Sequence, residues 1–202
     1  MEKIKAVTIA ENEDYLRQVS LPVEKNDPNL KEDIAKIEKY CKENEVLAMA
    51  SVQISIPKRL VYLKNTNLEI LEKINDGSAN EDEQKYNEAR VLINPVVLEK
   101  EGLTTYWEAC ASCMDYTGLV KRPYKIVVEY EDENRKPHQE TFTGFEATVL
   151  SHELDHLDGI LHIDIAEEVR NIPVEERKAL RKKEGYTILS ETGNYEELKE
   201  KK

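Results

Sequence analysis

Two histidines and a glutamate on one predicted helix could hold and use a metal ion. His152 and His156 are four positions apart, and Glu153 directly follows the first histidine. At about 3.6 residues per turn, side chains with this spacing lie about 40° apart around a helix, so both imidazoles can reach one point. A divalent ion there would make water a nucleophile at neutral pH, and Glu153 could take the proton of that water. The pattern indicates a metal-dependent hydrolase, unless the three side chains merely satisfy one another.

A catalytic ion needs a third protein ligand beside one open position, and the sequence offers two candidates. His162 stands where the longer pattern H-E-x-x-H-x-x-G-x-x-H of the metzincin proteases has its third histidine. That pattern also requires a methionine turn downstream of the helix, whereas Met1, Met49 and Met114 all precede it. We therefore expect His162 to be a half-exposed residue on a short strand, and Cys110 is the other candidate.

A helix over about residues 144–158 is expected to carry the two histidines. Thr143 and Glu146 have the spacing of a capping box, and Gly159 follows at the position of a left-handed C-terminal cap. One face of this helix carries, in order, Phe145, Val149, His152 and His156. Because this spacing continues an apolar stripe, both imidazoles should lie on the buried face.

The rest of the chain predicts short strands and two further helices. Apolar residues at helical spacing predict an outer helix that Asp27 caps and that buries Cys41. Another helix is expected over residues 173–183. The strand-like or β-rich segments are residues 47–54, 59–63, 91–98, 125–130 and 138–143, of which the last two should form a hairpin.

Composition limits the class of protein. The chain has 202 residues, enough for one domain with a sizeable core. Its 41 acidic and 29 basic residues give a net charge of −12, which argues against a nucleic-acid or anionic-membrane surface. No segment has the roughly 20 apolar residues of a membrane span, and the first residues lack the apolar core of a secretory signal. We expect a protein that stays inside the cell, with its three cysteines reduced.

Three segments, in order, resemble the motifs of the peptide deformylase family. Residues 152–159 read H-E-L-D-H-L-D-G and match the family's His-Glu-x-Asp-His-Leu-x-Gly fully. Residues 108–112 read E-A-C-A-S and match Glu-Gly-Cys-Leu-Ser at three of five positions. Residues 46–53 keep little more than Ala50 and Gln53 of Gly-x-Gly-Leu-Ala-Ala-x-Gln. The resemblance extends from about residue 6 to residue 164.

The resemblance implies an α+β domain in which antiparallel strands surround a central metal-binding helix. It also implies an enzyme that removes the N-formyl group from the N-terminal formyl-methionine of newly made polypeptides. The implied site residues are Cys110, His152 and His156 for the metal, with Glu153, Gln53 and the backbone N–H of Ala111 for catalysis. Glu153 would be the general acid and base, and the other two groups would donate to the developing oxyanion.

One divalent ion is the implied cofactor. Fe²⁺ is the expected ion, with Zn²⁺ or Ni²⁺ as alternatives, because a thiolate ligand suits softer metals. Cys113 is expected not to bind it. The implied partners are N-formylated nascent peptides and, transiently, the region of the ribosome exit, without membrane or nucleic-acid binding. The expected location is the cytoplasm, or an organelle if a transit peptide has been removed.

We expect the catalytic domain to span residues 1–165, with a polar insertion near 64–89 and a charged, partly helical extension over 166–202. Departures from the family motifs fall in segments expected near the substrate. Val46, Ala48 and Ala109 replace glycines, and Ala111 replaces a leucine. They leave three hypotheses: a deformylase, a related hydrolase with another N-acyl or peptide substrate, and a non-catalytic binding module of the same fold.

Overall fold

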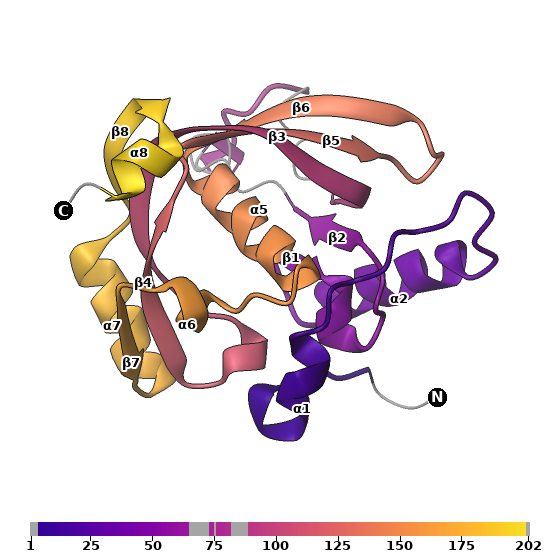
Figure 1. Ribbon diagram of the computed structural model, residues 1–202, viewed down its shortest axis with the longest axis horizontal. Coiled ribbons are helices and arrows are strands. Elements are labelled where there is room, and N and C mark those ends of the chain that lie inside the picture. The colour runs from indigo at the N-terminus through magenta and orange to yellow at the C-terminus, as the bar shows by residue number, and fades with distance from the viewer. Residues whose placement is uncertain (1–3, 65–72, 75, 82–88, 201–202) are drawn as a thin grey trace.

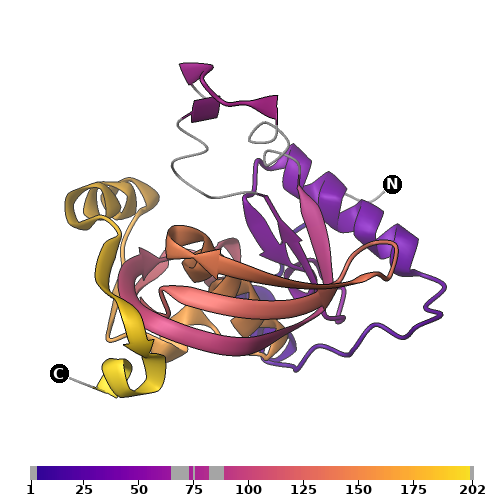
Figure 2. The same cartoon turned by 90° about the horizontal axis from the view of Figure 1, so that it is seen from above.

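An antiparallel sheet curves around one central helix in this protein. The computed structural model describes residues 4–64, 73–74, 76–81 and 89–200. Within them, helix α5 (Gly144–Leu157) lies in the hollow of the sheet, as Figure 1 shows from the front and Figure 2 from above. The expected α+β class, with antiparallel strands around the helix of the H-E-x-x-H motif, is confirmed. The insertion expected near 64–89 lies largely outside the described residues.

One long strand connects all parts of the sheet. The strands are β1 (Ala48–Ala50), β2 (Leu60–Leu63), β3 (Arg90–Glu108), β4 (Tyr116–Arg122), β5 (Lys125–Glu131), β6 (Pro137–Thr143), β7 (Glu168–Asn171) and β8 (Thr187–Asn194). Strand β3 pairs with β2 near its start, with β5 in its middle, and with β4 and β8 near its end. The sequence predicted only its first part, residues 91–98. The predicted hairpin is present as β5 and β6.

Helices cover both faces of the short strands β1 and β2. The other helices are α1 (Ile9–Leu16), α2 (Leu30–Glu43), α6 (His162–Ile165), α7 (Val174–Glu184) and α8 (Tyr195–Glu200), with the 3-10 turns η1 (Ser51–Ile54) and η2 (Ala111–Cys113). Along β2, Val61 and Leu63 pack in the core around α5, whereas Leu60 and Tyr62 pack in the core around α2. A strand buried on both faces needs a continuous apolar run, which is what these four residues provide.

The predicted start of the outer helix is wrong by about two residues. Helix α2 begins at Leu30 after Asn29, and the side chain of Asn29 makes no capping hydrogen bond. Asp27 instead accepts a hydrogen bond from the Asn29 N–H at 2.9 Å and pairs with Lys58 at 2.5 Å. Its carboxylate therefore fixes the turn before the helix. Cys41 lies in the core of this helix, 1% exposed, as expected.

Helix α5 has the predicted length, but its two ends differ in how they are capped. Thr143 makes no side-chain capping hydrogen bond, so the predicted capping box does not form. At the other end, the N–H of Gly159 donates to the His156 carbonyl and that of Ile160 to the Asp155 carbonyl, the paired bonds of a Schellman motif. Gly159 has the positive φ, +73°, that this cap requires. The cap ends the helix at Leu157, one residue after the second histidine.

None of the helices in the described ranges has the length and apolarity that crossing a bilayer requires.

The C-terminal strands join the same sheet, since β7 pairs with β4 and β8 with β3. Strands β7 and β8 thus lie beside the strands that precede and follow Cys110.

Gly159→Ala is expected to destabilise the protein by about 3 kcal/mol or more, because left-handed strain of about 1–2 kcal/mol is added to an overpacking cost of about 1–3 kcal/mol. A Cβ at Gly159 would lie 2.2 Å from the Arg17 carbonyl oxygen, so α1 must move. Gly144→Ala is the matched control, with φ +62° and nothing within 4 Å of the added Cβ. Denaturant unfolding of both variants measures the difference. Equal losses would contradict the role assigned to the Arg17 contact.

Candidate metal centre

Helix α5 directs both histidines of the motif to one point. His152 and His156 are buried, and their Nε2 atoms are 3.2 Å apart. Two nitrogens that bind one ion tetrahedrally at about 2.0–2.1 Å are separated by about 3.3 Å, so the observed spacing fits a shared ion. The helical spacing that predicted convergence of the two imidazoles thus produces it in the fold.

Cys110 meets these two histidines from the end of β3. It lies between β3 and η2, and its Sγ and the histidine nitrogens are all within 4.8 Å of one another. Hydrogen bonds from Cys113 and from the imidazoles of His152, His156 and His162 hold the pKa of Cys110 well below its ordinary value, against the opposing effect of burial. A thiolate is the form of cysteine that binds metals. The three residues expected as ligands are therefore brought together in a ligand-competent arrangement.

One face of β3 packs along α5 and fixes how the helix is turned. Alternate residues of β3 contact the helix: Thr104 Oγ1 lies 3.3 Å from Thr148 Oγ1, and the Tyr106 ring packs edge-on against Phe145. Glu108 is next on this face, and His152 Nδ1–H donates to its Oε2 at 2.8 Å. This bond leaves Nε2 of His152 free to face His156.

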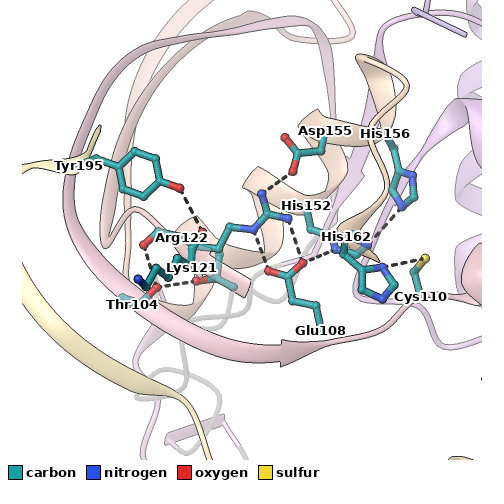
Figure 3. Close-up of polar contacts among 11 residues, drawn as sticks. Thr104, Glu108, Cys110, Lys121, Arg122, His152, Asp155, His156, His162 and Tyr195 are labelled. Atoms are coloured by element: carbon teal, nitrogen blue, oxygen red, sulfur yellow. Dashed lines mark hydrogen bonds and ion pairs between the residues drawn. The ribbon is translucent and has the colours of Figure 1, made fainter. Parts of the chain in front are cut away.

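Glu108 belongs to a buried network that sequence reasoning did not assign (Figure 3). Arg122 donates from Nε and Nη2 to the two Glu108 oxygens at 2.7 and 2.9 Å, and from Nη1 to Asp155. Burial disfavours the Glu108 charge, but Arg122 outweighs it and holds the pKa of Glu108 far below its usual range. Burial likewise opposes charge on His152, yet its bonds to Cys110 and Glu108 raise the His152 pKa. The sequence signal that could have identified Glu108 is its place as a charged residue two positions before Cys110.

Glu153 and Gln53 meet at the backbone N–H of Ala50. Glu153 is 6% exposed, and its Oε2 accepts the Ala50 N–H at 2.7 Å. Gln53 lies in η1, accepts the same N–H at 3.1 Å, and donates from Nε2 to Ser112 Oγ at 3.1 Å. Burial raises the pKa of Glu153. A raised pKa makes this carboxyl group easier to protonate, which suits a group that must both take up and release a proton.

A cavity of about 380 Å³ opens beside these groups. Gln53, Cys110, Ala111, His152 and Glu153 all line it. Apolar side chains supply much of the remaining wall, among them Leu47, Met49, Tyr106, Phe145 and Val149. The motif departures Val46, Ala48, Ala109 and Ala111 line it as well. The apolar stripe that was expected to be buried with the histidines thus faces this cavity, and a different stripe, Ala147, Leu150, Leu154 and Leu157, packs in the core.

The predicted place of His162 is wrong. It is 1% exposed and begins the short helix α6 instead of lying half-exposed on a strand. Its Nδ1 is 4.0 Å from Cys110 Sγ, and Figure 3 shows the His162 ring beside the cysteine. Cys113, also buried, joins Cys110 and His162 in a second group whose ligand atoms lie within 4.8 Å of one another. Cys110 is thus shared by two sets of donors.

Three comparisons with known proteins, by family profile, by sequence and by solved structure, agree on one family. The sequence profile of polypeptide deformylases matches residues 4–171. Peptide deformylases of Novosphingobium aromaticivorans and Finegoldia magna are 32% and 34% identical, over 83% and 84% of this chain and 92% and 93% of theirs. The solved peptide deformylase of Synechococcus elongatus, in complex with actinonin, superposes with a TM-score of 0.66 at 25% identity, over 92% of this chain and 87% of the other.

Glu108→Ala should cost about 3–5 kcal/mol in unfolding free energy, because the buried Arg122 loses the carboxylate that pairs with its Nε and Nη2 and keeps Asp155 alone. It should also weaken metal binding by about 10–100-fold, because His152 loses the acceptor that orients it. The half-exposed pair of Arg90 with Glu140, 2.7 Å apart, provides the control Glu140→Ala, with an expected cost of about 1 kcal/mol. Denaturant unfolding and metal titration measure both effects. Unchanged metal affinity in Glu108→Ala would disprove the orienting role.

Proposed function

Because the chain belongs to the peptide deformylase family, whose members remove the formyl group from nascent peptides, we propose that Cys110, His152 and His156 hold the metal ion for this reaction. The observation that carries the proposal is the convergence of one thiol and two imidazole nitrogens within 4.8 Å at the wall of a cavity. Three protein ligands beside an open cavity are typical of a catalytic ion rather than a structural one.

The donor set indicates which ions fit. A thiolate and two imidazoles suit Fe²⁺, Zn²⁺ and Ni²⁺, and we propose one such ion per chain, with Fe²⁺ as the ion used in the cell. When bound, the ion supplies Lewis-acid polarisation and makes water nucleophilic at neutral pH. His152 keeps its Nε2 available because Glu108 accepts from its Nδ1.

Glu153 is the proposed proton carrier. Its carboxylate lies one residue after the first histidine, lines the cavity, and has a pKa raised by burial. It can take the proton of the attacking water and deliver it to the amine that leaves as the new N-terminus. The Ala50 N–H holds one of its oxygens, which leaves the other free to act.

Gln53 and the backbone N–H of Ala111 are the proposed oxyanion donors. Both residues line the cavity that the proposed ligands also line. One Nε2 hydrogen of Gln53 is held by Ser112 Oγ, and the amide has a second hydrogen to offer. As the formyl carbon becomes tetrahedral, its oxygen gains charge that these two donors can stabilise.

The cavity supports a substrate with an apolar first side chain. Its apolar lining and volume of about 380 Å³ suit formyl-methionine and part of the following peptide. Substrates would be met as N-formylated chains leave the ribosome, in the cytoplasm or in an organelle. A related hydrolase with another N-acyl or peptide substrate is the second candidate, because Val46, Ala48, Ala109 and Ala111, which depart from the motifs, all line this cavity.

Glu153→Gln is expected to lower formate release from formyl-Met-Ala-Ser by about 10²–10⁴-fold, because the amide cannot carry the proton. The enzyme is loaded anaerobically with Fe²⁺ or with Ni²⁺, and metal content is measured on the same samples. Glu153→Gln should keep its metal, whereas Cys110→Ala should lose both metal and activity. A metal-loaded wild type that leaves this peptide intact, but hydrolyses another N-acyl peptide, would favour the second candidate.

Gln53→Leu should lower kcat by about 10²–10³-fold with little change in metal content, because one oxyanion donor is removed. Gln139, exposed on β6, gives the matched control Gln139→Leu, which should leave kcat unchanged. Steady-state rates at saturating peptide test this. A variant that raises only KM would show that Gln53 binds substrate without stabilising the transition state.

A further inference from the structure

Helix α7 forms part of the cavity wall, although it follows residue 171, where the match to the family profile ends. Three hydrogen bonds dock this helix onto the strand and turn that flank Cys110. Arg181 Nε donates to the Trp107 carbonyl at 2.7 Å, Trp107 Nε1 donates to Glu184 at 2.5 Å, and Arg177 Nη1 donates to the Met114 carbonyl at 2.8 Å. The wall is therefore held in a fixed position.

Arg181 is the residue of α7 that lines the cavity. Its guanidinium carbon lies 5.2 Å from the centre of the Tyr106 ring, and its Nε is held by Trp107. The Tyr106 ring itself packs against Phe145 and Tyr186. A guanidinium fixed at Nε and stacked on a ring keeps its two terminal amino groups in one orientation, which is the arrangement that receives a carboxylate through two hydrogen bonds.

No carboxylate among the described residues pairs with Arg181, whose contacts there are a carbonyl and a ring. The two glutamates of the cavity wall are held by other groups, Glu108 by Arg122 and His152, and Glu153 by the Ala50 N–H. Arg181 is also the one lysine or arginine among the described lining residues. Burial lowers the pKa of Arg181 and outweighs Glu108 and Cys110, which favour its charge from a distance. A half-buried cation that no carboxylate pairs is costly, and a bound carboxylate would reduce that cost.

We propose that Arg181 is a substrate-binding residue that takes up a carboxylate of the peptide beyond its formyl-methionine. The inference rests on the proposed function, since it assumes that the formyl group lies at Cys110, His152 and His156 in the same cavity. Such a carboxylate can come from two sources. One is an aspartate or glutamate side chain near the start of a nascent chain, and the other is the terminal carboxylate of a short peptide.

Paired substrates separate the two sources. The side-chain arm compares formyl-Met-Asp-Ser-amide with formyl-Met-Asn-Ser-amide, and formyl-Met-Ala-Asp-amide with its Asn counterpart. The terminal arm compares formyl-Met-Ala-Ser with its amide. In the metal-loaded wild type, kcat/KM should be about tenfold higher for the carboxylate member of at least one pair. A charge-assisted hydrogen bond between Arg181 and the substrate has an effect of about this size.

Arg181→Gln should reduce this ratio to about one, and Arg181→Lys should retain part of it, because lysine keeps the charge without the planar fork. The control is Lys182→Gln, which removes an exposed positive charge from the same helix and should leave the ratio unchanged. A purely structural role for Arg181 would lower kcat/KM equally for both members of a pair and so would not move the ratio.

Binding of the deformylated products gives a readout that does not depend on turnover. Calorimetry with Met-Asp-Ser-amide and Met-Asn-Ser-amide, and with Met-Ala-Ser and its amide, should show the same preference in the wild type and its loss in Arg181→Gln. Equal ratios in the wild type and Arg181→Gln, in both measurements, overturn the proposal. Selective binding of the acidic products without formate release would instead overturn the proposed function and leave the role of Arg181 standing.

Discussion

The buried ion pair between Glu108 and Arg122 is the contact on which the metal centre depends. Two charges removed from water are costly unless each is fully paired, and here Glu108 uses both oxygens while Arg122 also reaches Asp155. The pair joins the ends of β3 and β4 to α5. It thereby fixes the rotation of the helix, because a turn about its axis would separate both Asp155 and His152 from their partners.

This arrangement separates the parts of the site that must stay constant from those that can change. The proposed ligands are positioned by a helix, a long strand and a buried charged network. Val46, Ala48, Ala109 and Ala111, which depart from the family motifs, line the cavity instead and contribute no atom to the ligand group. A chain can therefore keep its metal chemistry while the shape and charge of its substrate cavity diverge, and Arg181 on α7 is one such addition.

Local sequence pattern predicted what depends on local geometry. The i and i+4 spacing of His152 and His156 predicted their convergence, and the glycine after the helix predicted its cap. The predicted location of His162 was wrong because its burial depends on how the chain returns after Gly159, and no local spacing encodes that return. Glu108 was not assigned a role, since its two partners are 14 and 44 residues away. The full length of β3 was missed because polar residues in its middle interrupt the apolar pattern, while pairing with β5 keeps it extended.

The order of elements along the chain has a consequence for synthesis of the protein itself. Every residue of the core around α5 lies at or before Leu157, and so do the three proposed metal ligands. Since the chain is synthesised from its N-terminus, all members of this core have been made before α7. The metal-binding unit therefore needs no residue of the wall that carries Arg181, and that wall can be added to a core already complete.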